Sequence, residues 1–259
     1  MSESSAMRPP GTVLVTGGTG TLGRAVVAAL RERGEAPRVV SRRQGAGLTT
    51  ADLRTGVGLA AALDGVDTVF HLATNNRDDL DISRGLLDAA RASGTPPRLV
   101  YISIVGVDDI PLPYYRGKLA VERAIEGSGL PFAILRATQF HPFIERLFTT
   151  QRALPVLFAP NFSAQPIAVE EVAGRLIELA DAGSTGRAAD IGGPEVLSLR
   201  ELALQYRAAR GGRRPVAPLA LPGATVRAYR AGHNLVPGPP FGRQRFGEYL
   251  ASRFGIHGA

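Results

Sequence analysis

The chain has 259 residues, of which 44% are hydrophobic and 20% are charged, so it is long enough to bury a full core and too apolar to be disordered. It contains no cysteine, which excludes disulfides, thiol nucleophiles and thiolate metal sites, and its first residues, MSESSAMRPP, lack the apolar segment of a signal peptide. The formal net charge of +7 rests on 29 arginines and one lysine, Lys118; because aromatic residues do not interleave with the arginines, we expect a solvated basic surface rather than a nucleic-acid partner.

Strands and helices are predicted to alternate along the first two thirds of the chain. Short apolar, β-branched runs such as TVLVT and TVFHL are typical of buried parallel strands, and apolar residues at helical spacing predict the helices. The predicted strands cover 12–16, 38–41, 48–53, 68–72, 98–103 and 132–136, and the predicted helices cover 21–33, 59–63, 80–93, 114–127 and 170–181. No apolar run approaches membrane-spanning length, so we expect no membrane partner and a cytoplasmic location.

This alternation predicts an α/β fold with a Rossmann-type, doubly wound parallel sheet, whose ligand lies beyond the carboxyl ends of the strands. After about Thr138 the pattern loosens, and proline and glycine become frequent, as in PLALPGATV and NLVPGPPFG. We expect residues 1–259 to form a single domain in which 138–168 and 194–259 make a small C-terminal substrate lobe. The alternative is ordinary surface loop with two or three helices.

A glycine-rich turn follows the first predicted strand and opens the first predicted helix. In TGGTGTLG, Gly17 allows a tight turn, Gly20 lets backbone approach a pyrophosphate, and Gly23 permits close packing of helix on strand. The helix N-terminus then offers its amides to the phosphates. The pattern predicts a dinucleotide site rather than a purely structural turn, with contacts from Thr16, Gly17, Gly20, Thr21, Leu22 and Gly23.

The end of the second strand indicates which dinucleotide is bound. An NAD site carries an acidic residue there, whereas this chain has Ser41, Arg42 and Arg43. Two guanidinium groups suit a 2′-phosphate, so the sequence predicts NADP(H); the alternative is a pair of surface arginines. Asp52, next to Leu53, stands where an adenine amino group would bind, although a turn aspartate explains it nearly as well.

Several motifs together resemble one family. The segments TGGTGTLG, VSRR, LDGVDTVFHLAT, YISIVGVD and YYRGKLAVERAIEGSGLPFAILRATQFH resemble atypical short-chain dehydrogenases/reductases of the NmrA-like group, and the resemblance extends from Thr12 to Ala203. It implies that Ala73 and Thr74 line the adenosine side, that Ser103 faces the nicotinamide end, and that 137–140 pass the nicotinamide and open onto the substrate. The group also includes NADP(H)-binding sensors without turnover.

Tyr114 and Lys118 match the family's Tyr-x-x-x-Lys, and a separation of four residues places both on one helix face. A phenol has a reference pKa of about 10, and a nearby ammonium lowers that pKa and favours proton relay to or from a substrate oxygen. The lysine would also hold the nicotinamide ribose. The alternative is a pair on a helix surface, and Tyr115 replaces Tyr114 if the helix register differs.

The remaining candidates follow the fifth and sixth predicted strands. The hydroxyl of Ser103, eleven residues before Tyr114, suits a hydrogen bond to a substrate carbonyl, although the short spacing also fits a serine that satisfies backbone groups. Gln139 and His141 are predicted substrate contacts, and Pro142 suggests a turn beside them. The four histidines show no metal-ligand spacing, so no metal is expected.

These features predict an NADPH-dependent oxidoreductase that transfers hydride to a small carbonyl compound or an activated double bond. Its partner would be a small-molecule substrate. One alternative is a non-catalytic NADP(H)-binding regulator of the NmrA type, which would act through a protein partner. The other is an epimerase or dehydratase with a tightly held cofactor, which would consume no NADPH.

Overall fold

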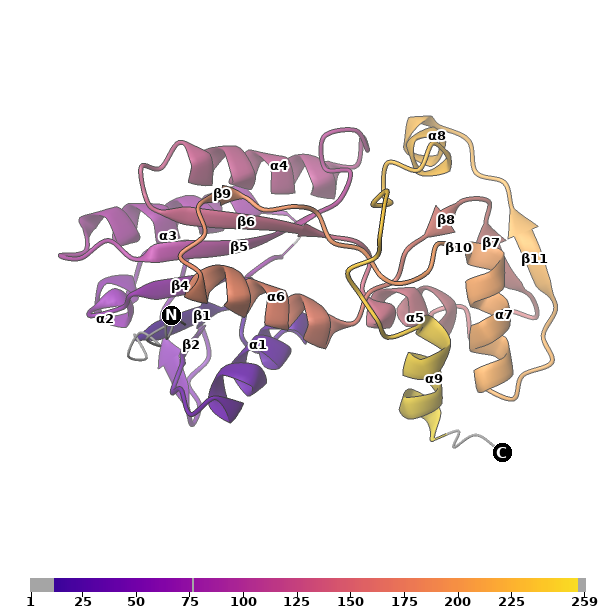
Figure 1. Cartoon of the computed structure of the whole chain (residues 1–259), viewed down its shortest axis with the longest axis horizontal. Helices are drawn as coiled ribbons and strands as arrows, with labels where there is room; N and C mark the ends of the chain where they lie inside the picture. Colours follow the sequence, from indigo (N-terminus) through magenta and orange to yellow (C-terminus); the bar gives the residue numbers. More distant parts are fainter. Residues whose placement is uncertain (1–11, 76, 256–259) are drawn as a thin grey trace, which may run out of the picture. The chain divides into compact units, whose positions relative to one another are not determined.

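A seven-stranded sheet dominates the computed structural model, which describes residues 12–75 and 77–255. The strand order is β3-β2-β1-β4-β5-β6-β9 (Figure 1). The chain starts at β1, winds outward through β2 and β3, and returns to place β4 on the other side of β1, with parallel pairing on both sides. The strands are β1 (Val13–Thr16), β2 (Arg38–Ser41), β3 (Leu48–Thr50), β4 (Thr68–His71), β5 (Arg98–Ile104), β6 (Phe132–Ala137) and β9 (Gly186–Arg187). This order confirms the predicted doubly wound α/β fold and puts a switch point between β1 and β4.

The predicted helices are present to within one or two residues of their expected ends. They are α1 (Thr21–Glu32), α2 (Leu59–Leu63), α3 (Asp79–Ala92), α4 (Pro113–Glu126) and α6 (Val169–Asp181). The third strand is shorter than expected, because the chain turns at Asp52, whose carbonyl accepts a hydrogen bond from the Gly56 amide. No helix within the described ranges is long and apolar enough to cross a membrane.

The chain divides into two compact units, and each is described by itself. The first contains the described residues up to Tyr101, together with Arg123–Ala133 and Ala173–Gly186. The second contains Ile102–Glu122, Ile134–Val172 and the described residues from Arg187 onward. The divisions along the chain therefore fall within strands β5, β6 and β9 and within helices α4 and α6.

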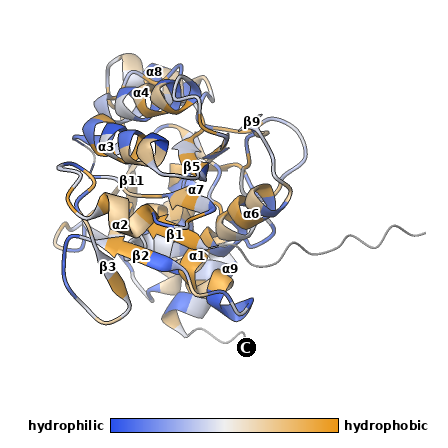
Figure 2. Cartoon of the chain, turned by 90° about the vertical axis from the view of Figure 1, so that its left-hand side faces the viewer, coloured by the Kyte–Doolittle hydropathy of each residue, from blue (hydrophilic) through white to orange (hydrophobic). Residues whose placement is uncertain are grey.

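The first unit is built around strand β1. All four residues of β1 are buried, and the strand is orange in Figure 2 because three of them are strongly apolar. Helix α1 carries a buried apolar stripe that includes Val26 and Leu30, and helix α2 packs against α3. The carboxyl end of β1, where Thr16 leads into the glycine-rich turn, is therefore held on a rigid base.

The second unit has an apolar core of its own. Helix α7 packs against α9, β7 and β11 (Figure 1), and the buried side chains there include Phe148, Leu202, Tyr206 and Phe246. Strands β7 and β11 pair in parallel, and β8 and β10 pair antiparallel. The elements are α5 (His141–Thr149), β7 (Leu157–Pro160), β8 (Ser163–Ala164), β10 (Leu197–Ser198), α7 (Leu199–Ala209), β11 (Val216–Leu219), α8 (Ala224–Arg230) and α9 (Phe246–Phe254).

Helix α5 replaces the turn that Pro142 suggested. The helix begins at His141, and the proline occupies its first turn, where the missing amide would have no helical partner and the fixed φ suits the helix. The expectation of a turn at this proline was therefore wrong.

Candidate functional site

Two glycines of the turn after β1 have no room for a side chain. Gly17 has a φ of +67°, and a Cβ added there would lie 2.7 Å from the backbone of Ala73. A Cβ added at Gly23 would lie 2.1 Å from the carbonyl oxygen of Gly17. Only glycine fits at either position, because a side chain would push backbone away from backbone.

Helix α1 begins directly at this turn without a capping side chain. Its N-cap is Gly20, whose carbonyl accepts the amide of Arg24 at 3.0 Å. The amides of the first three helical residues, Thr21, Leu22 and Gly23, precede that hydrogen bond and have no acceptor one turn earlier in the helix. Gly20 and Thr21 are exposed. This arrangement fits a phosphate, because both the amides and the helix dipole favour an anion.

A buried polar chain ties the turn to the end of β4. The hydroxyl of Ser83 donates to the carbonyl of Asp79 at 2.7 Å, so it accepts from Nε2–H of His71 at 2.8 Å. In the neutral imidazole Nδ1 is then an acceptor, and the Thr16 hydroxyl donates to it at 2.9 Å. The Thr16 oxygen in turn accepts the amides of Leu72 and Ala73. Thr16 therefore positions the turn through its side chain, and His71 is a buried histidine that links Thr16 to Ser83.

The loop after β4 is held by one carboxylate. Asp79, in the first turn of α3, accepts from the Thr74 hydroxyl at 2.6 Å and from the Asn75 amide at 2.7 Å. This fixes the backbone beyond Ala73, where the resemblance implies an adenosine contact. Sequence analysis missed Asp79, although an acidic residue in the first turn of a predicted helix is a recognisable signal.

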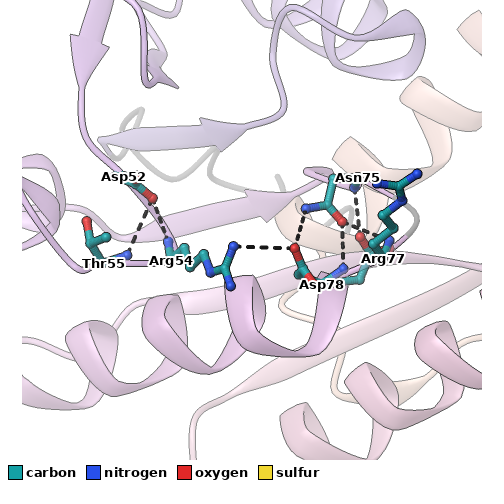
Figure 3. A network of polar contacts seen from close by, with 7 residues as sticks. Asp52, Arg54, Thr55, Asn75, Arg77 and Asp78 are labelled. Atoms are coloured by element: carbon teal, nitrogen blue, oxygen red, sulfur yellow. Dashed lines mark hydrogen bonds and ion pairs between the residues drawn. The ribbon is translucent and has the colours of Figure 1, made fainter.

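The loop after β3 is joined to the loop after β4 by an ion pair. Asp52 accepts the amides of Arg54 and Thr55, at 2.8 and 3.4 Å, and so makes the turn that was its alternative interpretation. Nη1 of Arg54 reaches the carboxylate of Asp78 at 3.5 Å, as Figure 3 shows. Next to Asp52, half-buried Leu53 lies on the same loop. A contact of Asp52 with adenine stays a prediction.

The end of β2 presents two exposed arginines. The Arg43 amide donates to the Ser41 hydroxyl at 3.0 Å, which turns the chain after the strand. Within residues 12–75 and 77–255, neither Arg42 nor Arg43 forms an ion pair with a carboxylate. Both guanidinium groups are therefore open to an anionic ligand.

In the second unit, Tyr114 and Lys118 lie together on helix α4. Lys118 is 3% exposed, its Nζ donates to the Ile102 carbonyl at 3.5 Å, and it lies 5.9 Å from the centre of the Tyr114 ring. Burial of an ammonium is costly and rare in a surface pair. Tyr115 faces elsewhere: it is buried, and its hydroxyl accepts from Tyr229 at 3.0 Å.

Ser103 and Gln139 carry polar atoms that lack partners. Ser103 is 2% exposed, and its Oγ has no hydrogen-bond partner in the described part of the chain. Both side-chain amide atoms of Gln139 are likewise buried without a partner among those residues. Buried polar groups are nearly always satisfied, so each of these residues is a candidate to contact a ligand.

An ion-pair cluster that sequence analysis missed holds helix α4. Nε and Nη2 of buried Arg136 donate to the two carboxylate oxygens of Glu122 at 2.9 and 2.6 Å, and Asp108 binds the outer nitrogens. Although burial opposes the charged form, the hydrogen bonds to Glu122 and Asp108 raise the pKa of Arg136. Glu122 lies one turn beyond Lys118 on α4. An arginine within the apolar run FAILRA was the available signal, because a buried guanidinium needs a partner.

His141 lies in a different environment from the Tyr114–Lys118 pair. It is 0% exposed, it lines a cavity of about 480 Å³, and neither Tyr114 nor Lys118 belongs to the wall of that cavity. Burial lowers the pKa of His141 to about 4. Its role as a substrate contact stays a prediction. No cluster of three potential metal ligands is found within the described residues.

Two curated relatives cover most of the chain. The chain is 31% identical over 208 residues to a (4-alkanoyl-5-oxo-2,5-dihydrofuran-3-yl)methyl phosphate reductase of Streptomyces griseus, which covers 74% of this chain and 72% of the relative. It is 27% identical to an NAD(P)H azoreductase of Xenophilus azovorans, over 81% of this chain and 77% of the relative.

A solved structure and a family match complete the comparison. An NADPH-dependent quinone oxidoreductase of Escherichia coli, solved with NADPH, superimposes with a TM-score of 0.79 over 94% of this chain and 100% of its own. The identity is 18%, so this likeness shows the fold. Residues 9–161 match the NmrA-like family, which is more than half of the chain. The chain therefore belongs to the NmrA-like family.

Proposed function

We propose that the chain is an NADPH-dependent oxidoreductase of the short-chain dehydrogenase/reductase type, which reduces a small carbonyl compound or an activated double bond in the cytoplasm. The observation that carries the proposal is the burial of Lys118, the only lysine of the chain, one helical turn after Tyr114. The two relatives described above, both named as reductases, support an NAD(P)H-dependent reaction.

The first unit supplies the residues that fit the cofactor. The exposed start of α1 at Gly20 and Thr21 suits the pyrophosphate, and the open pair of Arg42 and Arg43 suits the 2′-phosphate that distinguishes NADPH. The backbone at Ala73 and Thr74 suits the adenosine side. NADPH supplies the hydride when it is bound.

The second unit supplies the proton. Tyr114 donates the hydrogen of its phenol to the carbonyl oxygen that gains negative charge during reduction, and the ammonium of Lys118 stabilises the phenolate that remains. Lys118 reaches the Ile102 carbonyl at the end of β5, and this contact fixes the ammonium beside the tyrosine ring. The same lysine holds the ribose hydroxyls of the cofactor.

Substrate recognition falls to the unsatisfied polar groups and the C-terminal segments. Ser103 donates to the substrate oxygen and Gln139 contacts a polar substituent, because both residues carry buried polar atoms without partners in the described chain. We assign the substrate lobe to 138–168 and 194–259, which belong to the second unit apart from their undescribed residues.

The test is a pair of tyrosine variants, assayed with NADPH against a panel of carbonyl compounds and quinones. Tyr114→Phe removes the proton donor, so turnover is expected to fall by about 10² to 10⁴-fold while NADPH affinity changes little. Tyr115→Phe is the matched control and is expected to keep most of its turnover, because the Tyr115 hydroxyl is engaged by Tyr229 and the ring is buried away from the proposed proton transfer.

Three results would contradict the proposal. Equal turnover of Tyr114→Phe and the wild type removes Tyr114 from the mechanism. Tight NADPH binding without turnover on any substrate favours the non-catalytic regulator. Conversion of a substrate without net consumption of NADPH favours the epimerase or dehydratase.

A further inference from the structure

Helix α8 lies in a segment of the second unit that has little contact with the core. We define the α8 segment as residues 223–233, none of which is buried. Figure 1 shows α8 apart from helices α7 and α9. Backbone amides of the segment donate to carbonyls inside it, as from Arg227 to Gly223 at 3.1 Å and from His233 to Ala228 at 3.3 Å. The segment can therefore move without breaking the hydrogen bonds of any sheet.

The chain is fixed on both sides of the α8 segment. Before it, strand β11 pairs with β7. After it, Asn234 is 0% exposed and its Nδ2 donates to the Ser163 carbonyl at 2.9 Å. Gly223 and Gly232 flank the helix with φ of +110° and +82°, and a Cβ added at Gly223 would meet no atom within 4 Å. These two glycines suit hinges, because they can absorb a change of backbone angle without a clash.

Side chains hold the α8 segment in place. The ring of Tyr229 stacks on Phe162, with 4.7 Å between the ring centres. The Tyr229 hydroxyl donates to the Tyr115 hydroxyl at 3.0 Å, and Nε of Arg230 donates to the Asn161 carbonyl at 3.1 Å. Contacts so few require little free energy to break, which is typical of segments that open locally.

The α8 segment packs beside the proposed proton donor, Tyr114. Ala228 and Tyr229 pack against a small buried apolar cluster, and Tyr114 packs against the same cluster. The buried residues of this cluster are Val107, Ile110 and Tyr115. Outward movement of α8 would therefore uncover the region next to Tyr114.

Gln139, the proposed contact for a polar substituent of the substrate, lies near the same place. Burial and then the neighbouring Tyr229 raise the pKa of Tyr115, whereas an interaction with Gln139 lowers it, so the Gln139 amide lies close to the Tyr115 hydroxyl. Both amide atoms of Gln139 are buried and form no hydrogen bond of ordinary geometry with the described residues. A substrate reaches them only if a neighbour moves. Thr138 and Tyr115 are 3% and 5% exposed, so the exposed α8 segment is the neighbour that moves most easily.

We propose that the α8 segment is a lid, which opens to admit the substrate to Gln139 and closes through the two contacts of Tyr229. The inference rests on the proposed function, because it takes Gln139 as a substrate contact. A closed lid keeps water away from the reacting carbonyl and confines the substrate beside Tyr114. In the Tyr115→Phe control described above the stacked ring of Tyr229 remains, so the lid still closes.

The test measures how fast a thiol reagent reaches position 139. Because the chain has no cysteine, Gln139→Cys introduces a single thiol, whose reaction with an excess of a chromogenic disulfide reagent is followed by absorbance. Two further single variants set the scale. Val196→Cys places the thiol at a 52% exposed position, and Leu202→Cys places it at a 0% exposed position of the α7 core, which only unfolding uncovers. A lid predicts an intermediate rate for Gln139→Cys.

A second substitution then identifies the moving element. Tyr229→Ala removes both contacts and is expected to speed the labelling of Gln139→Cys by about tenfold to a hundredfold. Arg227→Ala is the matched control: it changes an exposed residue of the same helix and is expected to leave the rate unchanged. If Tyr229→Ala does not fold, Tyr229→Phe removes the hydroxyl alone and is expected to speed labelling by about threefold to tenfold.

Three results would overturn the lid. Labelling of Gln139→Cys as fast as that of Val196→Cys shows that nothing covers the site. Labelling as slow as that of Leu202→Cys shows that only unfolding uncovers it. Equal rates with the Tyr229 and Arg227 substitutions show that another element moves. The measurement needs neither NADPH nor turnover, so a chain without reductase activity would contradict the proposed function without changing this result.

Discussion

The imidazole of His141 remains neutral in the folded chain at neutral pH because it is buried between aromatic rings and a backbone carbonyl. Its Nε2 bonds to Gln244, and Tyr249 and Phe246 pack against its ring. Burial lowers the pKa from 6.5 to about 4. A group whose pKa is lower in the folded than in the unfolded chain makes folding depend on pH between those two values.

We therefore expect acid to destabilise the chain through this residue. Between pH 6.5 and pH 4 the unfolded chain binds the proton more readily, so the free energy of unfolding falls as the pH drops, by up to about 3 kcal/mol. Above pH 6.5 His141 is neutral in both the folded and the unfolded chain, so its contribution to the free energy of unfolding is fully present and no longer changes with pH. Urea unfolding at a series of pH values measures it, and His141→Gln should show a flatter pH dependence than the wild type. Parallel curves for the two proteins would contradict the assignment.

At the scale of elements, helix α4 is fixed by its ion pairs rather than by its apolar face alone. The Arg136 guanidinium on β6 binds Glu122 through two hydrogen bonds, with side chains that are 6% and 2% exposed. Because Glu122 and Lys118 are one turn apart, the rotation of α4 that satisfies Arg136 also turns Lys118 toward the Ile102 carbonyl. The buried ion pair of Glu122 and Arg136 thus positions the proposed acid/base pair.

Removal of the Glu122 charge is expected to destabilise the chain by about 3 to 5 kcal/mol, because it leaves a buried guanidinium incompletely paired. Glu122→Gln is the variant, and Asp108→Asn is the control, with a much smaller expected loss because Asp108 is half-exposed. Urea unfolding measures both. The double variant Glu122→Leu/Arg136→Met should regain much of the stability, since it leaves no buried charge. Similar small losses in both single variants would show that the pair does not hold α4.

The accuracy of prediction also differed between elements. Strands such as β1 and β4 were predictable because each is a short buried run whose periodicity is local. Helix α5 was missed because its proline resembled a turn, although prolines also occupy first helical turns. The pairing of β7 with β11 joins segments that are distant in sequence, and no local pattern reports such contacts. Among site residues, Lys118 was identified from the composition of the sequence. The ion pair of Glu122 and Arg136, which holds the helix that carries Lys118, could be found only from the fold.

At the scale of the whole molecule, the charge of +7 offers a competing explanation for any anion binding. A general positive field attracts NADPH wherever the arginines lie, and salt screens that attraction. A local site acts differently, because direct hydrogen bonds from Arg42 and Arg43 distinguish a 2′-phosphate from a hydroxyl.

Two double variants separate these explanations. Arg42→Ser/Arg43→Ser is expected to weaken NADPH binding by about 100-fold, the loss of charge-assisted hydrogen bonds, with little change for NADH. Arg84→Ser/Arg91→Ser removes the same charge from exposed positions on α3 and is expected to leave both affinities nearly unchanged. Fluorescence titrations at low and physiological salt measure both. Equal weakening by the two double variants would assign the binding to the general field.

The glycine-rich turn constrains any attempt to redesign this protein. A methyl group at Gly17 or Gly23 would collide with neighbouring main chain, so these two positions accept only glycine. The exposed end of β2 carries no such restriction. An engineer who wishes to exchange one coenzyme for the other should therefore leave the turn untouched and mutate positions 41–43.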